Sequence, residues 1–268
     1  QNSNTFNNLS AGSYTINIED ANNCTDIVNI TITEPNIGVS SSASFIQPIC
    51  WGASSGSITV NSTGGTTPYQ YSIDGGATWQ SSNTFNNLFA GNYTINIEDA
   101  NNCTDIVNIT ITEPTQLTNS AIFIEPSCNG DSDGSITITT TGATPSYQYS
   151  IDGGATWQNS NTFNNLSAGS YTIDIQDANS CTDIISVTVT EPAILVASIG
   201  TTSNVSCFGM SDGSITITTI GGTAPYQYSI DGGATWQNSN TFNNLSAGSY
   251  TINIEDANNC TDIVNITI

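Results

Sequence analysis

Carboxylates are the side chains in this sequence with the greatest capacity for chemistry. The chain has 22 Asp and Glu residues, and an eight-residue pattern, Ser-x-Asp-x-Gly-x-Thr-Trp, places one carboxylate between two hydroxyl groups. The pattern occurs at 72–79, 150–157 and 229–236. A carboxylate can act as a general acid, a general base or a cation ligand, so each of these roles has to be weighed.

The absence of basic residues excludes several classes of function. The chain contains no Lys, Arg or His and has a formal net charge of −22. Binding to nucleic-acid phosphates depends on Lys and Arg, so we expect no nucleic-acid partner. Histidine-dependent acid–base catalysis, Schiff-base chemistry and the lysine of a phosphate-binding loop are excluded as well.

The repeated pattern resembles the Asp box of sialidases, yet a sialidase would need arginines to hold its substrate, and this chain has none. The Asp-Gly dipeptide favours a hairpin turn, in which the Asp accepts hydrogen bonds from backbone N–H groups. The Trp would then anchor the returning strand. We therefore predict a structural hairpin rather than an active site, and no enzymatic activity. The residues concerned are Asp74, Trp79, Asp152, Trp157, Asp231 and Trp236.

Calcium is the one cofactor that the sequence suggests. Asn129, Asp131 and Asp133 match the first half of an EF-hand loop, but Thr140 stands where the loop needs a Glu. A second oxygen-rich segment, Asp99–Asp105, recurs in every repeat. It is either a calcium site or a turn rich in Asp and Asn that the disulfide closes.

Internal repetition organises the whole chain. Residues 1–32 reappear unchanged at 237–268, and the period is about 79 residues, which is the size of a small domain. The sequence predicts the C-terminal half of a repeat at 1–35, complete repeats at 36–114 and 115–192, and a nearly complete repeat at 193–268. A Thr-Glu-Pro segment closes each of the first three.

The cysteines follow the same period. In each of the last three repeats, two cysteines are 53 residues apart, which predicts one disulfide within each repeat. The predicted pairs are Cys50–Cys103, Cys128–Cys181 and Cys207–Cys260. Disulfides place the protein outside the reducing cytosol.

Each repeat contains short segments in which apolar and polar residues alternate, as in SITVN and NYTINIED. A period of two predicts antiparallel strands with one buried face. We predict an all-β chain of tandem immunoglobulin-like β-sandwiches, with about seven strands each, arranged end to end as a rod. Tyrosines at the start of a late strand are typical of a tyrosine corner: Tyr14, Tyr93, Tyr171 and Tyr250.

The segments CWGASSGSITV, GGTTPYQYSIDGG, NLFAGNYTINIEDANNCT and ITITEP together resemble the SprB-type repeat. That family occurs in large surface adhesins of gliding bacteria, so the resemblance implies an extracellular filament exported by type IX secretion. It implies that the repeats hold an adhesive tip away from the cell and support surface attachment or gliding. No catalytic residues carry over from the family.

Two other functions remain open at this point. Trp79, Trp157 and Trp236 could stack on sugar rings in a carbohydrate-binding array, or the chain could form a sheath or surface layer. The expected partners are neighbouring repeats of the same long chain, and surface polysaccharide or other filaments. Since no window of about 20 apolar residues occurs, we expect no membrane insertion.

Overall fold

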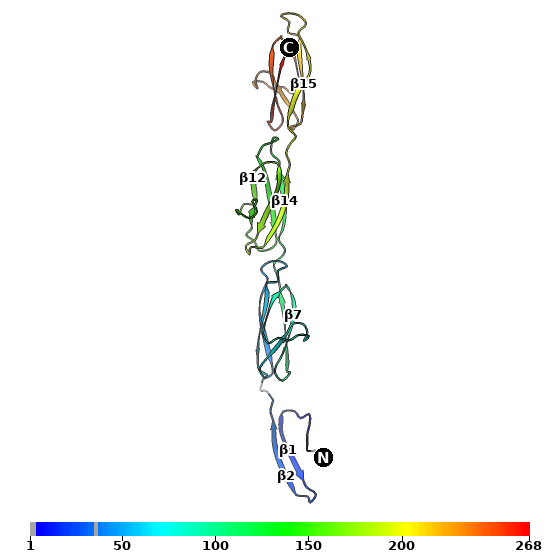
Figure 1. Ribbon diagram of the computed structural model, residues 1–268, viewed down its shortest axis with the longest axis vertical. Coiled ribbons are helices and arrows are strands. Elements are labelled where there is room, and N and C mark those ends of the chain that lie inside the picture. The colour runs from blue at the N-terminus through cyan, green and yellow to red at the C-terminus, as the bar shows by residue number, and fades with distance from the viewer. Residues whose placement is uncertain (1–3, 35–36) are drawn as a thin grey trace. The chain divides into compact units, whose positions relative to one another are not determined.

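The computed structural model of the chain describes residues 4–34 and 37–268 (Figure 1). All regular elements in these ranges are β-strands, which confirms the prediction of an all-β chain. The boundary predicted between residues 35 and 36 lies outside the described residues. None of the described residues forms a helix of the length and apolarity needed to cross a membrane.

The second repeat is a sandwich of two three-stranded antiparallel sheets. One sheet has the order β3-β4-β6 and the other has the order β5-β7-β8. The strands are β3 Ser40–Ile46, β4 Gly56–Thr63, β5 Gln70–Ser72, β6 Thr84–Leu88, β7 Gly91–Glu98 and β8 Thr104–Ile111.

The third and fourth repeats have the same topology. Their sheets have the orders β9-β10-β12 and β11-β13-β14 in the third repeat, and β15-β16-β18 and β17-β19-β20 in the fourth. The strands of the third repeat are β9 Thr118–Ile124, β10 Gly134–Thr141, β11 Gln148–Ser150, β12 Thr162–Leu166, β13 Gly169–Gln176 and β14 Thr182–Val189. Those of the fourth are β15 Val196–Ser203, β16 Gly213–Ile220, β17 Gln227–Ser229, β18 Thr241–Leu245, β19 Ser249–Glu255 and β20 Thr261–Thr267.

Alternation along the strands creates a separate core in each of these three repeats. In β4, Ile58 and Val60 are completely buried, while their neighbours on the strand are not. In β7, Ile95 and Ile97 fill the same core from the opposite sheet. The other two cores use the corresponding residues of the third and fourth repeats.

Each of the three sandwiches has six strands instead of the predicted seven. The missing strand is the one expected at Ala77–Gln80, where only an isolated bridge between Tyr71 and Gln80 forms. The residues of the Ser-x-Asp pattern form a turn there, so the chain returns to its partner strand for a single residue pair.

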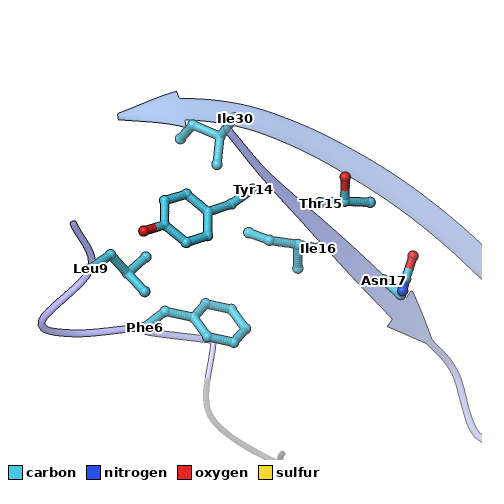
Figure 2. A pocket seen from close by; sticks show the side chains of 7 residues that line it. All are labelled: Phe6, Leu9, Tyr14, Thr15, Ile16, Asn17 and Ile30. Carbon is cyan, nitrogen blue, oxygen red and sulfur yellow. The ribbon is translucent and has the colours of Figure 1, made fainter. Parts of the chain in front are cut away.

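The first repeat contributes only two described strands, β1 Gly12–Glu19 and β2 Thr25–Ile32, which pair with each other. Tyr14, Ile16 and Ile30 line a hollow of about 350 Å³ together with Phe6 and Leu9 (Figure 2). The corresponding side chains of the second repeat belong to its closed core. The hollow is therefore the inner face of half a sandwich.

Candidate functional site

The Ser-x-Asp pattern forms a tight turn around one carboxylate. The Asp74 Oδ1 atom accepts hydrogen bonds from the Ser72 hydroxyl (2.7 Å) and the Thr78 N–H (2.9 Å). Its Oδ2 atom accepts one from the Thr78 hydroxyl at 2.6 Å. Ser72, which is buried, in turn accepts a hydrogen bond from the Gly76 N–H at 2.8 Å. The same contacts surround Asp152 and Asp231.

These hydrogen bonds favour the ionised carboxylate. The Thr78 side chain makes the largest contribution, followed by the Thr78 backbone and Ser72, and together they lower the pKa of Asp74 to about 2. The pKa values of Asp152 and Asp231 are lowered to about 2 by the equivalent groups. A carboxylate with so low a pKa is a poor general acid at neutral pH, and its oxygens already have donors within the turn.

The tryptophan of the pattern covers this turn. A Cβ atom placed on Gly76 would lie 3.6 Å from Cζ2 of Trp79, so the indole packs against the glycine. Gly76 also has a φ of +90°, a conformation that other residues rarely adopt. Trp79, Trp157 and Trp236 are half-buried. The indole therefore contacts the turn that the carboxylate closes.

The tyrosines at the start of β1, β7, β13 and β19 each fix the preceding turn. The Tyr93 hydroxyl donates a hydrogen bond to the Phe89 carbonyl at 2.9 Å. Tyr14, Tyr171 and Tyr250 make the same bond to the carbonyl four residues earlier.

A second carboxylate, which is buried in the three sandwiches, closes the turn between the last two strands of each. The Asp256 Oδ1 atom accepts hydrogen bonds from the N–H groups of Asn258 (2.8 Å) and Cys260 (2.9 Å). Its Oδ2 atom accepts one from the Thr223 N–H at 2.7 Å. We call this segment, Asp256–Cys260, and its equivalents Asp20–Cys24, Asp99–Cys103 and Asp177–Cys181, the Asp-Cys turn. In the Asp99 turn the backbone N–H groups of Cys103 and Thr66 lower the pKa of the carboxyl group.

The first cysteine of each repeat lies in a loop at the opposite end of the sandwich. We call this loop the Ser-Cys loop, and it spans Ser127–Asp133 in the third repeat and Ser206–Asp212 in the fourth. In the third repeat the Glu191 carboxylate accepts hydrogen bonds from the Gly130 N–H (2.8 Å) and the Asn129 amide (3.0 Å). In the second repeat Glu113 accepts one from the Gly52 N–H at 2.6 Å. The Glu of Thr-Glu-Pro thus attaches the end of the second and third repeats to the first cysteine loop of the same repeat.

The third and fourth repeats meet where the Ser-Cys loop of the third contacts the Asp-Cys turn of the fourth. Cys128 of the Ser-Cys loop forms a disulfide with Cys260 of the next repeat's Asp-Cys turn, with 5.6 Å between their Cα atoms. The Asn258 amide donates a hydrogen bond to the Ser127 carbonyl across the same joint, at 2.9 Å. A disulfide and a hydrogen bond therefore accompany the main-chain connection.

The three predicted disulfides within repeats are wrong. Cys128 pairs with Cys260 instead of Cys181, and Cys103 and Cys207 are free thiols, as is Cys24. Cys50 and Cys181 are disulfide-bonded, but Cys103 is not the partner of Cys50 and Cys128 is not the partner of Cys181.

Strand length explains why pairing within a repeat fails. In the second repeat β4, Gly56–Thr63, separates the Cys50 loop from Thr66, and Thr66 contacts the Asp-Cys turn that contains Cys103. Its eight residues span about 26 Å at roughly 3.3 Å each, whereas a disulfide needs Cα atoms within about 7 Å.

The candidate calcium ligands have contacts with the protein itself. The Asp133 carboxylate accepts hydrogen bonds from the Ser127 N–H (2.8 Å) and hydroxyl (2.5 Å), and the Asn129 amide donates to Glu191. The hydrogen bonds from the Ser127 hydroxyl and the Ser127 N–H lower the pKa of Asp133. In the described ranges no three His, Cys, Asp or Glu side chains are grouped so that they could hold a metal ion.

The sequence alone assigned no role in the turns or the joint to Ser72, Thr78, Glu113 or Glu191. Ser72 and Thr78 were part of the repeated pattern, and the Asp of each Asp-Cys turn always stands four residues before a cysteine. Those regularities were the available signal. The role of Glu113 and Glu191 had no such signal beyond their presence in Thr-Glu-Pro.

Several solved structures show partial similarity to this chain. The N-terminal eight Ig domains of the Down Syndrome Cell Adhesion Molecule match at 12% identity and TM-score 0.31, over 95% of this chain. Domains 1–6 of the surface layer protein SbsC match at 14% identity and TM-score 0.31, over 97% of it. The fibronectin(III)-like modules of Clostridium thermocellum CbhA match at 14% identity and TM-score 0.26, over 56% of this chain and 94% of theirs. This chain spans 40% of the first structure and 45% of the second.

Comparison with curated proteins gives no match. The family model of the SprB repeat matches three segments: 42–78, 121–156 and 199–235. Each begins in the first strand of a repeat and ends at or beside the Thr of the Ser-x-Asp pattern, so the match covers the first half of the repeat rather than all of it. The described fold shows that the second half of each repeat completes the same sandwich. The chain is therefore a tandem array in which each of the three sandwiches contains a segment that matches the SprB repeat.

Proposed function

We propose that this chain is a non-catalytic structural region of an extracellular adhesin filament. In this proposal the repeats hold an adhesive tip away from the cell and support surface attachment or gliding. The matches to the SprB repeat and the all-β sandwich fold support a structural repeat region of a surface protein.

The observation that carries the proposal is the joint between the third and fourth repeats. A spacer that keeps a tip at a distance must resist bending where its domains meet. A single connecting chain would leave the two domains free to swing about one point, which is the ordinary expectation for domains in tandem. The Cys128–Cys260 disulfide adds a second covalent attachment point.

The glutamate of the connection strengthens the same joint. Glu191 holds the Asn129–Gly130 loop, which lies next to Cys128, against the segment that leads into the fourth repeat. The Asn129 amide also donates to the Pro192 carbonyl at 3.2 Å. A disulfide in this position also favours an oxidising, extracellular location.

Small-angle scattering of the oxidised chain tests the proposal. We expect an elongated particle with a length of roughly 40 Å for each complete repeat, because strands of up to eight residues at ~3.3 Å plus the loops at both ends span about that distance. The double variant Cys128→Ser/Cys260→Ser should fold but sample a wider range of interdomain angles.

A compact particle for the oxidised chain, with repeats packed side by side, would contradict the spacer function. If the oxidised chain and the double variant sample the same range of interdomain angles, the disulfide does not stiffen the joint. Cys24→Ser is the matched control, since Cys24 is a free thiol and its loss should leave the scattering profile unchanged.

A further inference from the structure

Three cysteines in the described chain are free and exposed: Cys24, Cys103 and Cys207. Each of them lies in a structure that matches one side of the Cys128–Cys260 joint. Cys207 lies in a Ser-Cys loop, and Cys24 and Cys103 lie in Asp-Cys turns. The chain thus displays both sides of the joint on unpaired surfaces.

The Ser-Cys loop of the fourth repeat already has the conformation of the bonded loop. The Ser206 N–H donates to Asp212 Oδ1 at 2.9 Å, as the Ser127 N–H donates to Asp133 Oδ1 at 2.8 Å. The N–H three residues after Cys207 donates to its carbonyl at 3.1 Å, and the same bond of 3.1 Å follows Cys128. Gly209 and Gly130 have φ values of +80° and +84°. The free loop therefore needs no rearrangement to bind what the bonded loop binds.

The free Asp-Cys turns have the conformation of the bonded turn in the same way. The Asp99 carboxylate accepts from the N–H groups of Asn101 (2.8 Å) and Cys103 (2.9 Å), and Asp20 accepts from Asn22 and Cys24 at the same distances. In the bonded turn the Asn258 amide makes two hydrogen bonds, one to Thr223 within its repeat and one to Ser127 across the joint. Asn101 makes the first of these, to Thr66 at 2.9 Å. Its second amide hydrogen remains for a carbonyl of another repeat.

An apolar side chain next to Cys207 indicates the same surface. Phe208 is fully exposed, with a relative exposure of 108%. The corresponding residue of the third repeat, Asn129, contacts Glu191 and Pro192 in the connection between repeats. A phenyl ring at this position would lose its exposed surface against such a connection, which is favourable.

We propose that the Ser206–Asp212 loop is a docking surface for the Asp-Cys turn of a further SprB-type repeat, and that Cys207 forms a disulfide with the cysteine of that turn. The Asp20–Cys24 and Asp99–Cys103 turns are the complementary surface, which binds the Ser-Cys loop of another repeat. The inference rests on the proposed function in that its partner is a neighbouring repeat of the array. Two thiols lose two protons and two electrons to an external disulfide such as oxidised glutathione, which is reduced to two thiols.

The order of the cysteines gives such an array a specific connectivity. Cys207 lies between Cys128 and Cys260 in the sequence, so its bond to a later repeat would overlap the existing bond. Successive disulfides would interlock along the chain, and each complete repeat would be bonded at both ends.

An extended chain tests the proposal. Residues 112–192 are copied after Ile268, which places Thr-Glu-Pro and a complete repeat where the period requires them. The copy of Cys128 is changed to Ser, so the copy of Cys181 is the one added cysteine. After refolding in a glutathione redox buffer, thiol labelling and mass mapping should show Cys207 bonded to that copy. Cys24 and Cys103 should stay free.

The matched control is the same extended chain with Cys207→Ser, in which the added cysteine should become a free thiol. The proposal is wrong if Cys207 and the added cysteine both stay reactive in the folded, oxidised chain, or if the added cysteine pairs with Cys24 or Cys103 instead of Cys207. Either result leaves the scattering test of the spacer function intact, because that test depends on the Cys128–Cys260 joint.

Discussion

At the residue scale, the Ser-x-Asp pattern shows how a carboxylate can resemble a catalytic group and yet serve a turn. Asp74 has three donors from two residues of its own loop, and no basic residue exists in the chain to give it another partner. Its low pKa results from those hydrogen bonds rather than from a salt bridge. The same group therefore makes the fold sensitive to acid.

This sensitivity gives a prediction for the triple variant Asp74→Asn, Asp152→Asn and Asp231→Asn. The pKa of these carboxyl groups is about 2 in the folded chain and about 3.8 for an ordinary Asp. A group whose folded pKa is lowered stabilises the fold above its unfolded pKa, and loses that contribution as the pH falls through the folded value. The variant should be less stable than the original chain at pH 7, and the difference should shrink between pH 4 and pH 2.

Urea denaturation at pH 7, 4, 3 and 2 measures this difference. Asp131→Asn serves as the control, because the Asp131 carboxylate is exposed and its contact with the Ser127 hydroxyl is 3.5 Å long. A stability difference that stays constant over the whole range would show that ionisation of these three groups does not stabilise the turns.

At the element scale, each complete repeat carries its own core, so damage to one core should stay local. Ile138 of β10 is completely buried in the core of the third repeat, whereas Ile184 of β14 is 60% exposed. Removing a buried Ile side chain to Cβ loses apolar burial and leaves a cavity. Ile138→Ala should therefore destabilise the third repeat by about 2–5 kcal/mol.

The matched variant Ile184→Ala should change stability by less than about 0.5 kcal/mol, since it removes surface that is already hydrated. Hydrogen exchange followed by mass spectrometry measures both effects repeat by repeat. Loss of protection spread equally over the second, third and fourth repeats of Ile138→Ala would contradict separate cores.

The sequence could predict those features of each element that depend on neighbouring residues. Alternation in SITVN and NYTINIED correctly predicted the buried faces of β4 and β7. The disulfides could not be derived in this way. Because the period is about 79, a constant spacing of 53 residues within a repeat also places the second cysteine of the next repeat about 132 residues away, and 132 is the separation of Cys128 and Cys260. Only the position of each loop at one end of the sandwich distinguishes the two pairings.

At the scale of the whole molecule, the absence of Lys and Arg predicts resistance to trypsin-like proteases, which cut after those residues. The chain should stay intact in trypsin even when it is reduced and heated, while chymotrypsin should cut it under the same conditions. Gel electrophoresis checks both. Trypsin fragments would contradict the prediction.

The same composition predicts a response to ions. We expect the 22 carboxylates to lie about 6 Å apart along an extended array of roughly 130 Å, which is inside the ~8 Å Debye length at physiological salt. High salt or millimolar calcium should therefore make the array more flexible or cause it to bundle. Light scattering and electron microscopy measure this, and unchanged flexibility and association across all conditions would mean that the charges have no mechanical role.

The Cys128–Cys260 disulfide also decides how much of the chain can be pulled out when the array is under tension. Tension applied at Thr115 and Ile268 passes from Cys128 directly to Cys260, so the 131 residues from 129 to 259 are not on the path. At about 3.5 Å per residue, this removes roughly 460 Å of contour length. While the bond is intact, β9 and β20 are the strands of this unit that tension can peel away, and the five strands from β10 to β14 and the five from β15 to β19 stay inside a closed covalent loop.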